Sequence, residues 1–294
     1  MASSHQHTLA APTIFAGVGL HTGQRIRAAI VPAPAGAGVV FVRTDLGGRA
    51  IPAKAGHVVD TRLNTVLGDG SGATVSTVEH LMAALAALEV DNAIVELDGP
   101  EVPIMDGSAR DFVQLIEHVG RRRQEAPRQY LEVLSRVELN DGDRRVSLSP
   151  APRLELAFEI DFASPAIGRQ SLELVIDEAA FRSEIADART FGFMHEVEAL
   201  RAAGFALGGS LENAVVVDSG SVLNPEGLRR PDEFVRHKAL DALGDLYLLG
   251  HPLIGRFEGV RAGHALNNAL AREFLARPDA WRLRAATPDL ARAV

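Results

Sequence analysis

Two short segments, far apart in the sequence, carry side chains that could bind a metal ion. His237 and Asp241 lie four residues apart in a stretch with helical periodicity, so both side chains would lie on one face of a helix. His80, which directly follows Glu79, offers a second imidazole. Two imidazoles and one carboxylate leave a coordination position open for water, as catalytic zinc sites do. The sequence therefore suggests a metal-dependent hydrolase.

Each of these residues also has a purely structural interpretation. A histidine and an aspartate four residues apart can form an exposed ion pair on a helix. Glu79 stands three residues after Ser76, which is the spacing of a capping box, so it could simply cap a helix. Alternatively, Glu79 could accept a proton from water bound to the metal beside it. Both interpretations of Glu79 stay open on the sequence alone.

Three further residues could complete a catalytic site. His264, at a loop-to-helix transition, could protonate a leaving amine as a general acid. Asp245 lies one helical turn after Asp241 and could hold the His264 imidazolium by a charge-assisted hydrogen bond. Lys238 is one of only two lysines among 30 basic residues, and its position beside His237 suggests a specific contact with a substrate oxygen or phosphate. The other histidines are interpreted as structural, including His57, His118, His195 and His251.

Composition limits the possible classes of protein. The chain has 294 residues, of which 47% are hydrophobic and 23% charged, as in ordinary globular proteins. Its net charge of −8 does not favour a nucleic-acid partner. Cysteine is absent from the sequence, so a metal would be held by nitrogen and oxygen ligands, which suit zinc, iron(II) or manganese. No apolar run approaches the roughly 18 residues of a membrane span, and no secretory signal is recognisable, so a cytoplasmic protein is expected.

The elements that would position these residues follow the same pattern in both halves of the chain. In the first half we predict strands at residues 26–31, 39–43 and 94–97. We predict helices in this half at residues 74–90 and 109–122. In the second half the corresponding ranges are 131–139, 145–148 and 154–161 for strands, and 178–188, 232–249 and a start near 265 for helices. The charged stretch Arg121–Arg128 suggests a boundary between residues 1–126 and 127–294. The sequence thus predicts an α+β protein of two similar domains.

Residues 191–217 interrupt the second half. They contain a helical pattern at 196–203, the glycines Gly208 and Gly209, and a strand at 214–218. Their apolar side chains and flexible glycines could form a flap or tunnel wall over a site.

Six motifs, in order from about Leu9 to about Leu275, carry a resemblance to a known family. They are Gly17–Gly23, Ser76–Leu81, Pro103–Ser108, Arg189–Phe193, His237–Asp245 and Gly263–Asn268. Together they resemble the UDP-3-O-acyl-N-acetylglucosamine deacetylases, the zinc amidases of lipid A biosynthesis in Gram-negative bacteria. The resemblance implies two domains, each a five-stranded sheet packed on two helices, with the active site between them.

The resemblance also implies an activity and a metal. The expected reaction removes acetate from the glucosamine nitrogen of UDP-3-O-(3-hydroxyacyl)-N-acetylglucosamine, a committed step of lipid A biosynthesis. The zinc ligands would be His80, His237 and Asp241, and iron(II) could occupy the same site. Water bound to the metal would be the nucleophile. The substrate is amphiphilic, but no membrane span is expected. The protein is expected to act as a monomer.

Individual roles follow by matching position. The resemblance makes Glu79 the general base and His264 the general acid, with Asp245 supporting His264. Lys238 and Thr190 would flank the reacting carbonyl, with Thr190 donating to the oxyanion. The expected substrate contacts are the acyl passage at Phe191 and the insert after it, Leu20 near that passage, Phe162 against uracil, and Arg261 at the diphosphate. Leu63 is also expected to bind the substrate.

One segment departs from the family pattern. Arg62 and Asn64 stand where relatives carry methionine and cysteine. The preferred length of the acyl chain is therefore open, whereas the chemistry is not affected.

Two other functions fit part of the pattern. Two histidines and a carboxylate also form the facial triad of iron(II) oxygenases, although Glu79 and His264 would then have no role. A catalytically silent protein that binds nucleotide sugars would not need an acid and a base around a metal. Acetate release, measured with and without a chelator, would separate these alternatives from an amidase.

Overall fold

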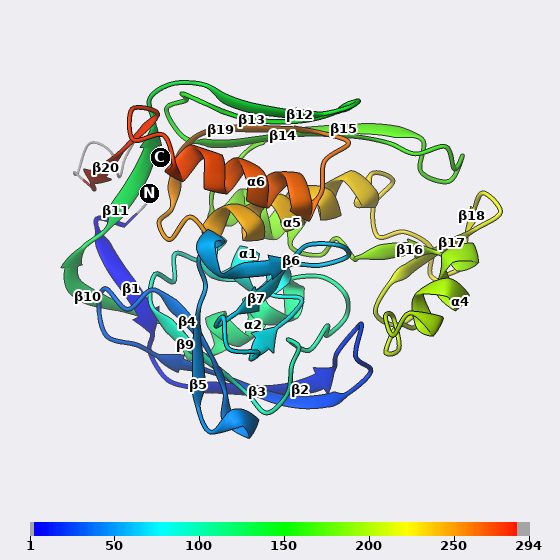
Figure 1. Ribbon diagram of the computed structural model, residues 1–294, viewed down its shortest axis with the longest axis horizontal. Coiled ribbons are helices and arrows are strands. Elements are labelled where there is room, and N and C mark those ends of the chain that lie inside the picture. The colour runs from blue at the N-terminus through cyan, green and yellow to red at the C-terminus, as the bar shows by residue number, and fades with distance from the viewer. Residues whose placement is uncertain (1–2, 287–294) are drawn as a thin grey trace.

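The computed structural model describes residues 3–286, which form four stacked layers in the order sheet, helices, helices, sheet (Figure 1). The first sheet has five strands in the order β2-β3-β9-β4-β5. Its strands are Thr13–Val18, Arg25–Pro32, Ala93–Leu97, Val39–Arg43 and Arg49–Pro52 in that order. Alternate residues of β4 are buried, so one face of the sheet packs against α1 (Glu79–Ala87) and α2 (Arg110–Val119).

The second sheet has seven strands, two more than the family resemblance implied. Its main path is β12-β13-β19-β11-β20, and β14 pairs with both β19 and β15. These strands are Val137–Asp141, Arg144–Ser149, Leu253–Val260, Gln129–Val133, Trp281–Ala285, Leu154–Asp161 and Arg169–Val175. Helices α5 (Glu233–Tyr247) and α6 (His264–Leu275) cover one face of this sheet (Figure 1). The predicted α+β class is confirmed.

Helices α1 and α5 form the centre of the molecule, where the two inner layers meet. Eight of the nine residues of α1 are buried, including Glu79 and His80. A helix that is buried all round must contact neighbours on every side. The contact with α5 is close at Gly244, where a Cβ atom would lie 2.0 Å from the carbonyl oxygen of Glu79. Only glycine allows this approach of the two backbones.

Replacing Gly244 with alanine should therefore destabilise the protein, although alanine is the better helix former. The added methyl group would push α5 away from Glu79, and overpacking of this kind lowers the free energy of unfolding by about 1–3 kcal/mol. Chemical denaturation measures the effect. Gly56→Ala is the matched control because a Cβ there meets no atom of the described residues within 4 Å. Equal stability of the two variants would contradict this account of the α1–α5 contact.

The predicted capping box at the start of α1 is wrong. The helix begins at Glu79 itself, after Val78 at the N-cap, which makes no side-chain cap hydrogen bond. Ser76 instead donates from Oγ to the Pro100 carbonyl at 3.1 Å, and Thr77 has a left-handed backbone with φ of 56°. Ser76 is held extended beside Glu101, so the helix cannot start at residue 74 as predicted. The Glu79 carboxylate is thereby free of the capping role.

Three other boundaries differ from the sequence prediction. The charged stretch predicted to separate the halves is strand β10 (Arg121–Pro127), which pairs with β1 (His5–Leu9). The predicted strand 131–139 is divided between β11 and β12, and the predicted helix 178–188 is a short helix, α3 (Glu178–Ala180), continued by a π-helical turn at Phe181–Ile185. We propose that the division at residue 126 still separates two domains, because each side carries its own large sheet with a pair of helices against it, α1 and α2 on one side and α5 and α6 on the other.

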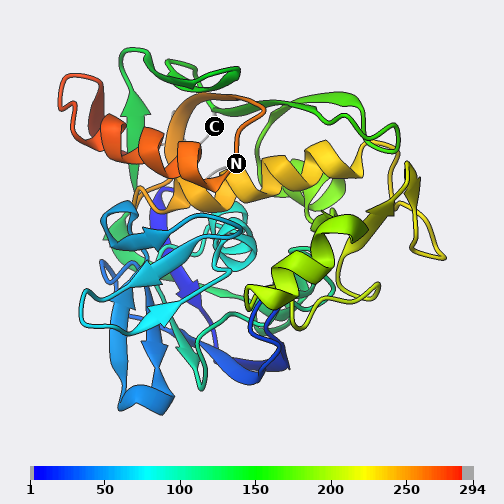
Figure 2. The same cartoon turned by 45° about the vertical axis from the view of Figure 1, so that its right-hand side comes forward.

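The insert after Phe191 forms a small three-stranded sheet and one helix. They are β16 (Phe191–Phe193), α4 (Met194–Ala202), β17 (Val215–Asp218) and β18 (Ser221–Val222). Figure 2 shows this unit standing out from the side of the four layers. A second small sheet consists of β6 (Val58–Asp60), β7 (Val66–Gly68) and β8 (Thr74–Val75).

Short 3-10 turns at Thr44–Leu46 and Ala55–His57 complete the described elements. Within residues 3–286, none of the helices combines the length and the apolar character needed to cross a membrane.

Candidate active site

Three buried side chains from the two central helices converge on one point. His80 comes from α1, and His237 and Asp241 come from α5. Each offers one ligand atom, and these atoms lie within 4.8 Å of one another. Asp241 Oδ1 is 3.5 Å from His80 Nε2 and 3.3 Å from His237 Nε2. The crossing of α1 and α5 therefore brings the two distant sequence segments together.

The donor atoms fit a divalent cation. Asp241 Oδ1 is buried without a hydrogen-bond partner among residues 3–286, which is costly for a carboxylate oxygen unless something else compensates its charge. His237 Nδ1 lies 3.0 Å from the Ala188 carbonyl oxygen. That carbonyl can only accept, so Nδ1 carries the proton and the Nε2 lone pair faces Asp241. Two imidazole nitrogens and a carboxylate oxygen suit zinc or iron(II).

Electrostatics keep these side chains in the states that bind metal. Burial lowers the pKa of His237 to about 4, so its imidazole is neutral at pH 7. Although burial acts in the opposite direction, His237 and Lys238 hold the pKa of Asp241 well below its usual range. Lys238 Nζ donates to Asp241 Oδ2 at 2.7 Å. The second carboxylate oxygen is thus engaged, and only Oδ1 faces the two imidazoles.

Glu79 and His264 lie beside this cluster. Glu79 Oε1 is 3.9 Å from His264 Nε2, and burial raises the pKa of Glu79. His264 Nδ1 is 2.9 Å from Asp245 Oδ2. Although burial opposes a charged imidazole, Asp245 and Glu79 raise the pKa of His264 to about 9. At neutral pH, His264 therefore carries two ring protons and can give one away.

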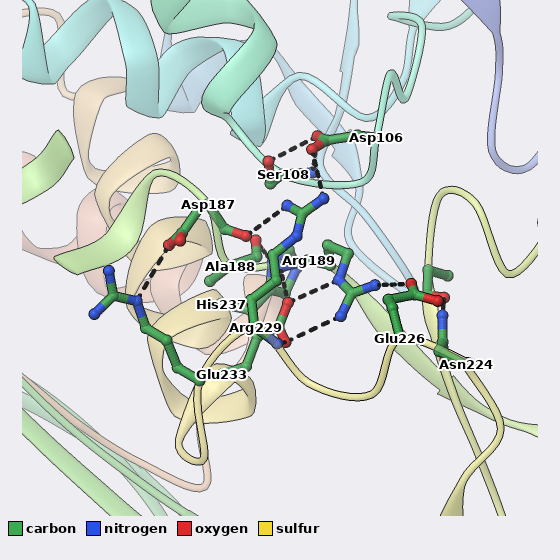
Figure 3. Close-up of polar contacts among 12 residues, drawn as sticks. Asp106, Ser108, Asp187, Ala188, Arg189, Asn224, Glu226, Arg229, Glu233 and His237 are labelled. Atoms are coloured by element: carbon green, nitrogen blue, oxygen red, sulfur yellow. Dashed lines mark hydrogen bonds and ion pairs between the residues drawn. The ribbon is translucent and has the colours of Figure 1, made fainter. Parts of the chain in front are cut away.

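A buried ion pair supports the segment that orients His237 (Figure 3). Arg189, 2% exposed, donates from Nε to Glu233 Oε1 at 2.9 Å and from Nη1 to Glu226 at 2.5 Å. Arg229 donates to the Asp187 carbonyl at 2.8 Å. Ala188, whose carbonyl contacts His237, lies between these two clamped residues. The cluster therefore fixes the imidazole through its hydrogen-bond acceptor.

We expect Glu233→Gln to weaken both the fold and metal binding. The change leaves the Arg189 charge buried without its inner partner, which lowers the free energy of unfolding by about 3–5 kcal/mol. Movement of the 187–189 segment should reduce metal affinity by about 10- to 100-fold. Denaturation and competition with a chelating dye measure the two effects.

Glu226→Gln is the matched control for this prediction. It contacts the same arginine, but its side chain is 55% exposed, so the loss should be about 1 kcal/mol or less. If both variants bound metal as tightly as the unaltered protein, the cluster would have no part in orienting His237.

The predicted substrate residues fall into two groups. Phe162 packs on Phe191 with ring centroids 5.6 Å apart, and Phe191 in turn lies 6.2 Å from the His237 ring. The Leu20 carbonyl accepts from Gly208 N at 3.0 Å, so the loop carrying Leu20 contacts the insert. These three residues therefore border the metal cluster or the insert.

The second group consists of Thr190, Leu63 and Arg261. The Thr190 backbone is fixed between the first half and the insert, since its N–H donates to the Gly107 carbonyl at 2.8 Å and its carbonyl accepts from Val215 N at 2.8 Å. Leu63 is 39% exposed. Arg261 forms ion pairs with Asp143 and Asp161 at the end of β19, so its guanidinium is already occupied by carboxylates.

The segment that departs from the family pattern also contacts the site. Arg62 places its guanidinium 5.5 Å from the Phe205 ring of the insert. Asn64 is buried and donates from Nδ2 to Thr77 Oγ1 at 2.7 Å. Thr65, which the sequence analysis did not single out, contacts Glu79, Asp245 and His264. Its only signal in the sequence is its place directly after Asn64.

Two more residues near the site were missed. Asn267 donates from Nδ2 to Asp245 Oδ2 at 2.9 Å, so it shares that oxygen with His264. His21 has its pKa lowered by burial, with His264 and His80 adding to the effect. Both belong to motifs quoted for the resemblance, yet neither spacing nor periodicity indicates where their side chains point.

Fold and site together define a class of protein: two sheet-and-helix halves with a buried His–His–Asp cluster and a neighbouring glutamate–histidine pair at their junction. The sequence matches the family model of UDP-3-O-acyl N-acetylglycosamine deacetylase (LpxC) over residues 6–276. The chain therefore belongs to this deacetylase family.

Individual relatives agree with the family model, and each of the following bears the name UDP-3-O-acyl-N-acetylglucosamine deacetylase. The protein from Phenylobacterium zucineum (strain HLK1) is 63% identical over 291 residues, covering 98% of this chain and 99% of the relative. The Acidithiobacillus ferrooxidans protein is 55% identical over 268 residues, covering 90% and 88%. The protein from Shewanella sp. (strain W3-18-1) is 52% identical over 270 residues, covering 91% and 88%.

Proposed function

We propose that this protein is a metal-dependent amidase that removes acetate from UDP-3-O-(3-hydroxyacyl)-N-acetylglucosamine, a step of lipid A biosynthesis. The observation that supports the proposal is the buried cluster of His80, His237 and Asp241, with the Glu79 carboxylate and the His264 imidazole beside it. Family membership supports the substrate, because the relatives are named for it. Zinc is the proposed cation, held by the two Nε2 atoms and Asp241 Oδ1.

A bound cation would supply the activation of water and the polarisation of the amide carbonyl. The remaining chemistry belongs to the side chains. Glu79 accepts a proton from the attacking water through Oε1, because Thr65 N already occupies its other oxygen at 3.0 Å. His264 donates its Nε2 proton to the departing glucosamine nitrogen, and Asp245 keeps the ring oriented through Nδ1.

Positive charge beside the cluster supports the developing oxyanion. Lys238 Nζ lies against Asp241, and although burial opposes its charge, Asp241 raises the pKa of Lys238, so it stays an ammonium. We propose that Lys238 and the Thr190 hydroxyl flank the reacting carbonyl. The acyl chain would then run past Phe191 toward the insert near Leu20, and Phe162 would pack against the uracil ring.

Contacts with the diphosphate are a separate proposal. Arg261 would have to exchange Asp143 or Asp161 for phosphate oxygens. A guanidinium binds carboxylate and phosphate with the same donor geometry, so one can replace the other. Leu63 would contact the sugar or the start of the acyl chain from the exposed side of the site.

Acetate release from the acylated nucleotide sugar tests the proposal. Purified protein should release one acetate per substrate without added oxygen or co-substrate. A chelator should abolish the release, and added zinc should restore it. Oxygen-dependent turnover would instead favour an iron(II) oxygenase, and tight substrate binding without acetate release would favour a nucleotide-sugar binding protein.

A further inference from the structure

Thr65 lies between the proposed base and the proposed acid and contacts both. It is 1% exposed and belongs to the loop joining β6 to β7 in the first half of the chain. We propose that Thr65 is a positioning residue that fixes Glu79 and His264 relative to each other. This inference rests on the proposed function, because it assigns Thr65 to the proton transfers of that reaction.

The hydroxyl of Thr65 acts on the acid through Asp245. Its Oγ1 donates to Asp245 Oδ1 at 2.6 Å and lies 3.2 Å from His264 Nδ1. Asp245 Oδ2 accepts from His264 Nδ1 and from Asn267 Nδ2, both at 2.9 Å. The carboxylate is therefore held by three donors, one on Oδ1 and two on Oδ2. Removing the Thr65 hydroxyl leaves Oδ1 unpaired and lets the carboxylate rotate away from the imidazole.

The backbone of Thr65 acts on the base. Its N–H donates to Glu79 Oε2 at 3.0 Å, and its carbonyl accepts from Val78 N at 3.5 Å. The first contact holds one carboxylate oxygen and leaves Oε1 directed toward His264 Nε2, 3.9 Å away. One residue thus sets the orientation of the base with its main chain and that of the acid with its side chain.

The loop that carries Thr65 is itself anchored. The neighbouring Asn64 donates to Thr77 Oγ1 at 2.7 Å, and Thr77 donates to Glu101 Oε1 at 2.7 Å. Glu101 is fully buried and also accepts from the backbone of His21 and Thr22. A satisfied buried network of this kind resists displacement. Thr65 is therefore a fixed reference point for the two groups.

Thr65 also joins the two halves at the site. Asp245, His264 and Asn267 all belong to the second half, on α5 and α6. Within residues 3–286, the Thr65 hydroxyl is the group of the first half that forms hydrogen bonds with the side chains of Asp245 and His264. Among the described residues, the Thr65 hydroxyl forms hydrogen bonds with Asp245 and His264 and with none of the proposed metal ligands. Loss of the hydroxyl should accordingly disturb the acid more than those ligands.

Three variants test the role of the hydroxyl. Thr65→Val keeps the size and the backbone N–H but removes the hydroxyl, whereas Thr65→Ser retains it. Thr8→Val is the matched control: Thr8 is also fully buried, and its hydroxyl accepts from Ala33 N at 2.9 Å, far from the site. We expect Thr65→Val to lower kcat by about 10- to 100-fold with KM and zinc content unchanged, and Thr65→Ser to recover most of the loss. Thr8→Val should keep the unaltered kcat.

A second measurement does not depend on turnover. In protein with ¹⁵N-labelled histidine, the Nδ1–H proton of His264 should give a downfield signal that moves or broadens in Thr65→Val and is preserved in Thr65→Ser and Thr8→Val. The inference is overturned if the signal is unchanged in Thr65→Val, if Thr65→Val turns over as fast as Thr8→Val, or if Thr65→Ser is as slow as Thr65→Val. Absence of acetate release by the unaltered protein would refute the proposed function instead, and the histidine signal would still decide the placement of the ring.

Discussion

Replacing Glu79 with glutamine should lower kcat by about 10²- to 10⁴-fold, the usual contribution of a positioned general base. Glutamine has the same size and can still accept from Thr65 N, which now lies 3.0 Å from the carboxylate. Its amide cannot take a proton from water. The fold and the metal content should therefore stay unchanged while turnover is lost, which steady-state kinetics on preparations of verified metal content would measure.

Glu273 on α6, whose side chain is half-exposed, provides a control for this change. It pairs with Arg277 one helical turn away, so Glu273→Gln alters charge without touching the site. Turnover by Glu79→Gln at the rate of Glu273→Gln would remove Glu79 from the mechanism. If kcat fell only because Glu79→Gln had lost its metal, Glu79 would instead be a residue that supports metal binding by His80.

Replacing Asp241 with asparagine should have an effect of similar or greater size, because it acts on the cation itself. A neutral amide oxygen is a weaker ligand, and the Lys238 ammonium would lose the negative charge that it contacts at 2.7 Å. Loss of Lewis-acid stabilisation worth several kcal/mol corresponds to a fall in kcat/KM on the order of 10³-fold or more. After dialysis, the variant should hold little zinc, as measured by elemental analysis.

Asp232→Asn is the matched control on the same helix. Its carboxylate pairs with Arg236 at 2.7 Å near the start of α5, away from the imidazoles. That variant should keep both zinc and activity. If Asp241→Asn kept its zinc through dialysis, Asp241 would not be a ligand, and the unpartnered Oδ1 would need another explanation.

The sequence predicted well those elements whose signal is local. Helix α5 was expected at 232–249 and runs over Glu233–Tyr247, because its periodicity continues for four turns. Strands β4 and β14 match their predicted bounds, since alternating or apolar runs end at turn residues. His80 converges with His237 and Asp241 because α1 crosses α5, and the periodicity of a sequence does not predict how two helices cross. The resemblance of the motifs to a known family indicated this convergence.

The errors have physical causes of their own. Strand β10 is polar and charged because much of both its faces is exposed, and its partner β1 lies more than a hundred residues earlier. A strand that is exposed on both faces lacks the alternation of polar and apolar residues by which strands are predicted. The capping box failed because a pairing of Ser76 with Glu101 overrides the local preference. Thr65 was missed for a similar reason: its contact with Asp245 spans 180 residues.

The origin of the proposed metal ligands has a consequence for the whole molecule. One imidazole belongs to α1 and the other two ligands belong to α5, so a cation bound to all three would tie the first half to the second. Any ligand that binds only the assembled form stabilises that form by mass action. Scarcity of the cation would then loosen the junction between the halves as well as stop the reaction, and cellular metal supply would govern the lifetime of the protein together with its output.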